Sequence, residues 1–181
     1  MTIKGRVALL VIIASFLVTS LPAASDIKFN PTKDLAYKGK GWTQVTDHLV
    51  SMSQNLAQLC IAPVPQKTAM PDNPHLDKFF HVYVNDIGRK AMLTEKIPQF
   101  PVGSIIVKEK LADANQKNAE LLTVMIKHQP GFDTNNGDWD YVVLNGNGQP
   151  IPTKTKLESC QNCHRDKKAQ DYIFRNYLTI E

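Results

Sequence analysis

Five consecutive residues near the C-terminus, Cys160-Gln161-Asn162-Cys163-His164, combine two thiols and an imidazole at a spacing suited to metal chemistry. On a helix the two sulfurs lie on the same side of about one turn. The run C-x-x-C-H is typical of c-type haem attachment, in which the thiols form thioethers with the haem vinyl groups. The adjacent His164 can then bind the iron as proximal ligand. We therefore expect one covalently attached haem c, held by Cys160, Cys163 and His164.

Other uses of the cysteine pair fit the sequence less well. A thioredoxin-like pair opens a helix after a strand, whereas residues 150–159 form a polar segment. Zinc would need two more ligands, and the chain has one further cysteine, Cys60. A structural disulfide would leave His164 without a role. Cys60 has apolar neighbours, which indicates a buried, inert thiol, with an intermolecular disulfide as the alternative.

Residues 1–25 have the layout of a secretory signal peptide. Lys4 and Arg6 form a short basic start, residues 7–18 are apolar, and Ala23-Ala24-Ser25 offers a cleavage site. The apolar run is short for a membrane span, which needs about 20 residues, and an uncleaved anchor is the alternative. We expect export to the periplasm, where c-type haem is attached in bacteria, and no membrane span after the leader is removed.

The remaining residues, 26–181, suit a single haem-binding domain with a substantial core. Loss of Lys4 and Arg6 with the leader lowers the formal charge from +4 to +2. The other lysines are scattered, without a basic arm or an aromatic-basic stripe. This distribution argues against a nucleic-acid partner.

The elements that must position the motif are mixed in type. Apolar residues at helical spacing predict a helix over residues 44–59, and a cap at Asn85 or Asp86 predicts another to about residue 95. A last helix is expected to hold the C-x-x-C-H run or to follow it, towards Leu178. Aromatic and β-branched runs predict four strands. These strands span residues 79–84, 104–110, 121–127 and 139–145.

Four strands with hairpin-type turns do not belong in a helical bundle. They exclude the all-helical haem folds, among them the small electron-transfer cytochromes c and the four-helix cytochromes c′. We expect an α+β fold, with a curved antiparallel sheet of about four to five strands, packed helices and a C-terminal haem-attachment segment.

The order of six short blocks resembles the cytochrome P-460 family, which includes the cytochromes c′-β. The resemblance spans about residues 35–178, and the haem motif near its end is its most specific block. The blocks are residues 81–86, 100–108, 124–127, 137–141, 160–164 and 171–174. This resemblance implies a homodimer built on a curved antiparallel sheet, with five-coordinate iron bound by His164.

Two activities are implied by the resemblance. Cytochromes P-460 proper oxidise hydroxylamine and carry an extra covalent bond from a lysine to the haem edge. Cytochromes c′-β bind nitric oxide and other diatomic gases in an apolar pocket. Lys108 aligns with the cross-linking lysine, and strand alternation puts it on the same face as Ile106 and Ser104. The alternative is an ordinary strand-end lysine that reaches solvent beside Glu109 and Lys110.

Chemistry on the iron needs an open sixth coordination position, whereas a protein ligand there would favour simple electron transfer. We consider eight residues for that ligand. They are Met52, Met70, Met92, Met125, His48, His75, His81 and His128. Met52 and Met125 are expected in the core, and the four histidines are expected to be structural or exposed. Met70, in a loop flanked by proline, is the most plausible ligand among the methionines.

Aromatic and acidic residues would tune an open site. Phe79, Phe80, Phe100 and Phe132 could supply an aromatic cap. A carboxylate would help to take protons from hydroxylamine, but we expect the acids of the middle region to be solvated surface charges. These acids are Glu95, Glu109 and Glu120.

Three functions are compatible with these residues. The first is a periplasmic mono-haem cytochrome with an open iron site that binds or transforms small nitrogen species such as nitric oxide, with one-electron redox. The second is a hydroxylamine-oxidising enzyme with a haem cross-linked through Lys108. The third is an electron carrier with a filled sixth site. We also expect a redox partner protein. The absence of a clear distal acid in the sequence favours the first function over the second.

Overall fold

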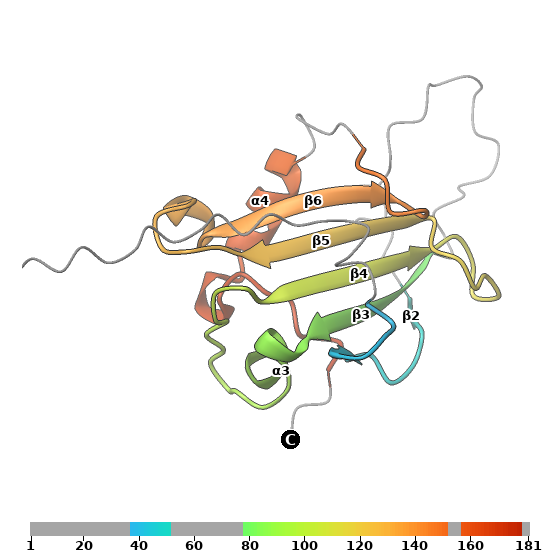
Figure 1. Cartoon of the computed structure of the whole chain (residues 1–181), viewed down its shortest axis with the longest axis horizontal. Coiled ribbons are helices and arrows are strands. Elements are labelled where there is room, and N and C mark those ends of the chain that lie inside the picture. The colour runs from blue at the N-terminus through green and yellow to red at the C-terminus, as the bar shows by residue number, and fades with distance from the viewer. Residues whose placement is uncertain (1–36, 52–77, 152–156, 179–181) are drawn as a thin grey trace, which may run out of the picture.

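The computed structural model of the chain describes residues 37–51, 78–151 and 157–178. Six antiparallel strands form one sheet, in the order β1-β3-β4-β5-β6, and β2 also pairs with β3 (Figure 1). The elements are β1 (Trp42–Gln44), β2 (Val50–Ser51), β3 (Phe79–Asn85), α3 (Asp86–Leu93), β4 (Ile105–Leu111), β5 (Leu121–Lys127), β6 (Trp139–Asn145) and α4 (Leu157–Arg165). A curved antiparallel sheet with two packed helices confirms the α+β class over the described residues.

The four predicted strands are confirmed as β3 to β6. The bounds of β5 and β6 are those that the sequence predicts, β3 is one residue longer, and β4 begins and ends one residue later. The helix predicted after β3 is confirmed as α3, and the side chain of Asn85 caps it by accepting a hydrogen bond from the Gly88 amide. A local cap and local runs of aromatic and β-branched residues were sufficient signals here because neither depends on distant residues.

The helix predicted over residues 44–59 is wrong in the part that the structure describes. Gln44 ends β1, and Val50–Ser51 forms β2. Both strands pair with β3, and between them the Val45 amide donates to the Val82 carbonyl. The edge of β3 thus binds the backbone groups that a helix would have paired internally, so tertiary pairing overrides the apolar spacing. The rest of the predicted helix lies outside the described residues.

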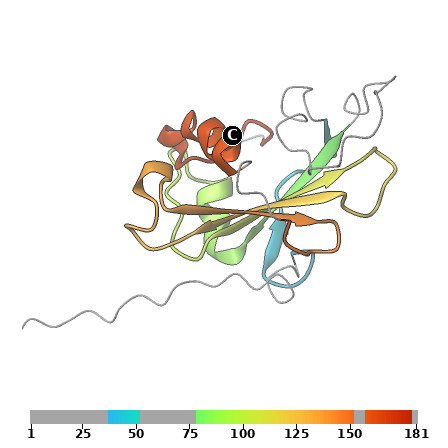
Figure 2. The same cartoon turned by 90° about the horizontal axis from the view of Figure 1, so that it is seen from above.

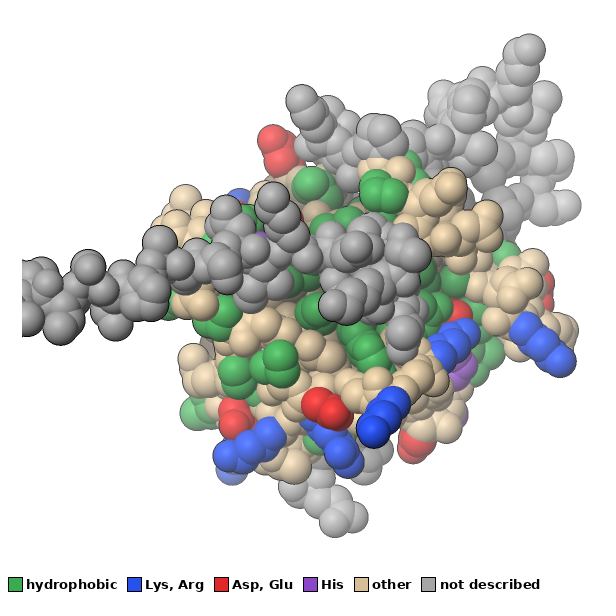
Figure 3. Space-filling model, viewed as in Figure 1, with side chains coloured by type: hydrophobic (Ala, Val, Ile, Leu, Met, Phe, Trp, Pro, Cys, Tyr) green, Lys and Arg blue, Asp and Glu red, His purple; other side chains and the backbone are tan. Residues whose placement is uncertain are grey.

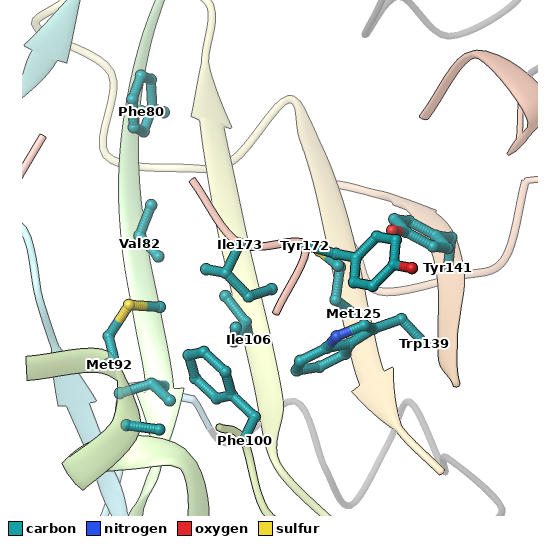
Figure 4. Close-up of a cluster of buried hydrophobic side chains, with 12 residues drawn as sticks. Phe80, Val82, Met92, Phe100, Ile106, Met125, Trp139, Tyr141, Tyr172 and Ile173 are labelled. Atoms are coloured by element: carbon teal, nitrogen blue, oxygen red, sulfur yellow. The ribbon is translucent and has the colours of Figure 1, made fainter. Parts of the chain in front are cut away.

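One face of the sheet packs against the C-terminal segment, residues 157–178, which Figure 2 shows on a single side of the strands. Large apolar side chains from β3 to β6 meet α3 and this segment in a buried cluster (Figure 4). Trp139 and Met92 are fully buried within it. The cluster thus joins the sheet to the C-terminal segment, which carries the C-x-x-C-H motif.

The opposite face of the sheet carries a second buried cluster and the side chain of Glu109. Glu109 is 2% exposed, so the expectation of a solvated surface charge is wrong for this residue. Its carboxylate accepts hydrogen bonds from the hydroxyls of Tyr37 and Tyr83 and from the amine of Lys38. Burial, and then the charge of Glu109, raises the pKa of both tyrosines. A buried carboxylate needs such partners, and the sequence did not reveal that Tyr37 would reach it.

The surface carries charges of both signs. On the face seen in Figure 3, acidic and basic side chains are interspersed along the lower edge of the molecule. In the described part of the chain, no helix is long and apolar enough to cross a membrane. The interspersed charges agree with the scattered pattern in the sequence.

Candidate haem site

Helix α4 carries all three residues of the C-x-x-C-H motif. Cys160, Cys163 and His164 lie within this one helix. The prediction that a helix holds the motif is confirmed. Its predicted continuation towards Leu178 is wrong, because α4 ends at Arg165 and only a 3₁₀ turn, Lys168–Gln170, follows in the described residues. The positive φ angles of Asp171 and Tyr172 prevent a helix from continuing there.

A cavity of about 330 Å³ lies between the sheet and the C-terminal segment, and the motif residues line it. This volume falls within the range of roughly 300–1,000 Å³ that is usual for cofactor and ligand sites. Its walls are largely apolar. The lining side chains come from β2 (Val50, Ser51), β3 (Phe80, Val82), β4 (Ile106, Lys108), β5 (Thr123, Val124, Met125), β6 (Tyr141, Val142, Val143), α4 (Ser159, Cys160, Cys163, His164) and the C-terminal segment (Ile173, Phe174, Asn176, Tyr177).

The imidazole of His164 is held in one orientation. Its Nδ1 lies 2.6 Å from the carbonyl oxygen of Tyr172, and only a protonated nitrogen can donate to that oxygen. The rings of Tyr141 and Phe174 stand edge-on to it, with centroids 5.4 and 5.1 Å away. Nδ1 therefore carries the proton, which leaves Nε2 with a lone pair for a metal.

The charge state of His164 agrees with this role. Burial lowers the pKa of His164, and the positive charge of Lys108 lowers it further, although the hydrogen bond to Tyr172 acts in the opposite direction. A lowered pKa keeps the imidazole neutral near pH 7. Neutral imidazole is the form that binds iron.

Lys108 reaches the same cavity from β4. It stands opposite Val82 on β3 and Thr123 on β5, all on the face that bears Ile106. Its amine lies 4.3 Å from the centroid of the Phe80 ring, which is a cation–π contact. Of the two directions that the sequence left open for Lys108, the structure has the inward one, whereas the covalent bond to haem stays a prediction.

The residues considered for the sixth ligand are widely separated. Met125 lines the cavity, whereas Met92 belongs to α3 and is buried in the core. His81 lies on the opposite face, where Gln44 and Thr46 contact its Nδ1. His128 is buried and stacks on Phe132, and His48 is exposed. Met52, Met70 and His75 lie outside the described residues.

Among the four phenylalanines expected near the site, Phe80 alone is a described lining residue. Phe100 packs on Trp139 in the core, and Phe132 is half exposed. Phe79 points to the other face of the sheet because it neighbours Phe80 in β3. Tyr141, Phe174 and Tyr177 supply the other aromatic walls, and sequence reasoning missed them. For Tyr141, alternation in the predicted strand with Trp139 was the available signal.

The acids considered for the site lie elsewhere. Glu109 faces away from the cavity, Glu120 pairs with Lys78, and Glu95 accepts from the Gln99 amide. Among the described residues that line the cavity, none is an aspartate or glutamate. Besides the thiols and the imidazole of the motif, the polar groups of the described lining are therefore hydroxyls, one amide and the amine of Lys108.

This donor set fits a haem. One helix presents two thiols and an oriented imidazole to a single cavity of suitable size, and the apolar walls suit a macrocycle. In the described residues, no group of three or more His, Cys, Asp or Glu side chains could hold a bare metal ion.

Comparison with known proteins agrees with the geometry of the site. The family model for cytochrome P460 matches residues 61–175, which include β3 to β6 and the whole C-x-x-C-H motif. A search of the curated proteins found no match. The matched region covers more than half of the chain and confirms the resemblance seen in the sequence. The chain belongs to the cytochrome P460 family and is a haem-binding cytochrome of the c type.

Proposed function

We propose that this protein carries one haem, covalently bound through Cys160 and Cys163, and binds or transforms small nitrogen species such as nitric oxide at an open iron position. The observation that carries the proposal is the cavity. It combines His164, oriented as a single proximal ligand, with walls that are largely apolar and lack a carboxylate among the described residues. Haem iron supplies reversible ligand binding and one-electron redox chemistry when bound.

Different residues of the chain would bind the iron and shape the ligand pocket. His164 would hold the iron from one side, with Nδ1–H bonded to the Tyr172 carbonyl. Apolar side chains such as Val82 and Ile106 would exclude water and favour neutral ligands over charged ones. Neutral diatomic gases are the ligands that such walls accept at least cost.

The proposal includes the cellular location of the protein and its protein partners. The basic, apolar and small-residue order of residues 1–25 supports export to the periplasm. A redox partner protein would exchange electrons with the haem. Membership of the family supports a homodimer.

Optical spectra of the purified holoprotein test the proposal. We expect high-spin bands in the reduced state, because the iron has one protein ligand, and a clear shift on addition of carbon monoxide or nitric oxide. Sharp low-spin bands that carbon monoxide leaves unchanged would contradict an open site. In that case Met125, which lines the cavity, would be the first residue to replace, and the electron-carrier function would gain support.

A second function, hydroxylamine oxidation, is favoured by one observation. The amine of Lys108 lies in the cavity, and a covalent bond from this lysine to the haem edge would require that position. The cation–π contact with Phe80 accounts for its position without a covalent bond, and the described lining lacks an acid to take protons.

Peptide mapping of the holoprotein is expected to recover the Lys108 peptide without haem mass. The reason is that the Phe80 ring stabilises the charged, unmodified amine of Lys108 through the cation–π contact. The Cys160–Cys163 peptide, which should carry the haem, serves as the internal control. A haem joined to both peptides, together with hydroxylamine turnover to an artificial acceptor, would establish the second function instead of the first.

A further inference from the structure

Two adjacent residues beside the motif have a backbone conformation that is costly for side chains of their kind. Asp171 and Tyr172 have φ angles of 51° and 66°, in the left-handed region. This region crowds the Cβ atom of an L-residue, although aspartate tolerates it better than tyrosine. Such strain persists only where the surroundings enforce it, and it is concentrated at functional sites. The carbonyl of Tyr172, which this conformation directs, is the acceptor for His164.

The carboxylate of Asp171 ties this turn to the sheet layer. One oxygen accepts from the backbone amide of Phe100 at 2.8 Å. The other accepts from the amine of Lys127 at 2.6 Å, and both side chains are largely buried, with exposures of 8% and 14%. The carbonyl of Asp171 also accepts from the indole of Trp139 at 2.9 Å. The turn is thus held at its first residue by three separate groups.

The second residue of the turn is confined by close packing. Lys127 also donates to the Gly137 carbonyl at 2.8 Å, so one amine joins this glycine to Asp171. A Cβ atom on Gly137 would lie 2.4 Å from the Tyr172 ring, which leaves no room for any other residue there. Figure 4 shows Tyr172 beside Trp139 and Tyr141 in the buried cluster. The Tyr172 carbonyl therefore has little freedom to move away from His164.

We propose that Asp171 and Lys127 are positioning residues that fix the hydrogen bond from His164 to the Tyr172 carbonyl and so set the strength of the iron–imidazole bond. The proposal rests on His164 being the proximal ligand. Hydrogen bonding at Nδ1 makes a ligating imidazole more basic. A more basic imidazole favours the ferric state and lowers the reduction potential. Neither residue touches the iron; both act through the turn.

Asp171→Asn tests this directly in the holoprotein. Asparagine tolerates the left-handed conformation and keeps an acceptor for the Phe100 amide, but it loses the charge that holds Lys127. We expect the iron–histidine stretching frequency of the reduced protein to fall, as measured by resonance Raman spectroscopy. The equilibrium constant for reduction should rise tenfold, which corresponds to an increase of about 59 mV in the midpoint potential for one electron. Lys127→Gln should lower the same frequency.

Glu120→Gln is the matched control. It cuts the ion pair between Lys78 and Glu120, which lies at the opposite end of β5 from Lys127. This variant should keep the wild-type frequency and potential. The inference is overturned if folded Asp171→Asn protein also keeps both, since Asp171 would then serve stability alone. Should Asp171→Asn fail to fold, an unchanged frequency in Lys127→Gln would overturn it equally.

Failure of the proposed function is distinguishable from failure of this inference. A wild-type holoprotein that shows no iron–histidine band in the reduced state would refute ligation by His164 before any variant is compared. A wild-type band that the variants leave unmoved would refute only the positioning role.

Discussion

The double variant Cys160→Ala, Cys163→Ala is expected to contain no covalently bound haem. Both thiols line the cavity from α4, and thioether bonds to the vinyl groups need both sulfurs. Mass spectrometry of the intact denatured protein should show the loss of one haem mass relative to the wild type. Acidified organic solvent should extract any residual haem, which it cannot do from a thioether-linked protein.

Cys60→Ala is the matched control for this pair, because it removes the third thiol of the chain and leaves the motif intact. It should retain the full haem mass. A double variant that still carries haem after denaturation would refute attachment through the motif. Loss of haem from Cys60→Ala would show that the inert role expected for Cys60 is wrong.

Replacement of His164 by glycine is expected to abolish the iron–histidine bond while the haem stays attached. The imidazole is enclosed between Tyr141 and Phe174, so its removal leaves a pocket of its own shape. The iron–histidine Raman band should disappear completely, and the reduced protein should lose its wild-type optical spectrum. Added imidazole should restore both, because it can enter the vacated space and donate to the same Tyr172 carbonyl.

The control for this variant is His48→Gly, which removes a histidine whose side chain is 70% exposed and lies outside the cavity lining. Its spectra should match the wild type with or without imidazole. Intact mass must first establish that His164→Gly carries its haem. A haem-bearing His164→Gly protein with an unchanged iron–histidine band would mean that another histidine binds the iron.

Much of the site could be predicted from the sequence because the informative signals are local. The C-x-x-C-H run is contiguous, so its placement on one helical turn needs no tertiary contact. Strands β3 to β6 follow from runs of aromatic and β-branched residues, and alternation within β4 puts Lys108 on the same side as Ile106. The helix predicted over residues 44–59 is wrong in its described part for the opposite reason, since the edge of β3 pairs with the backbone there.

Long-range contacts account for what sequence reasoning missed. A glutamate such as Glu109 is usually expected at the surface. Tyr37 and Tyr83, which are distant in the chain, instead donate hydrogen bonds to its buried carboxylate. The interaction between Asp171 and Lys127 likewise joins residues 44 positions apart. Neither pair follows a local pattern, and burial decides the role of each side chain.

By itself, the sequence determined the chemistry of this protein: two thiols and an imidazole at a fixed spacing, and a strand pattern that excludes an all-helical cytochrome. Only the tertiary structure decided how the imidazole is used. It brought the Tyr172 carbonyl to His164, turned Lys108 into the same cavity and kept Glu109 out of it. The physical reason is that the order of residues in the chain determines which functional groups lie near one another along the backbone. Packing of the sheet against the C-terminal segment determines which distant groups come into contact.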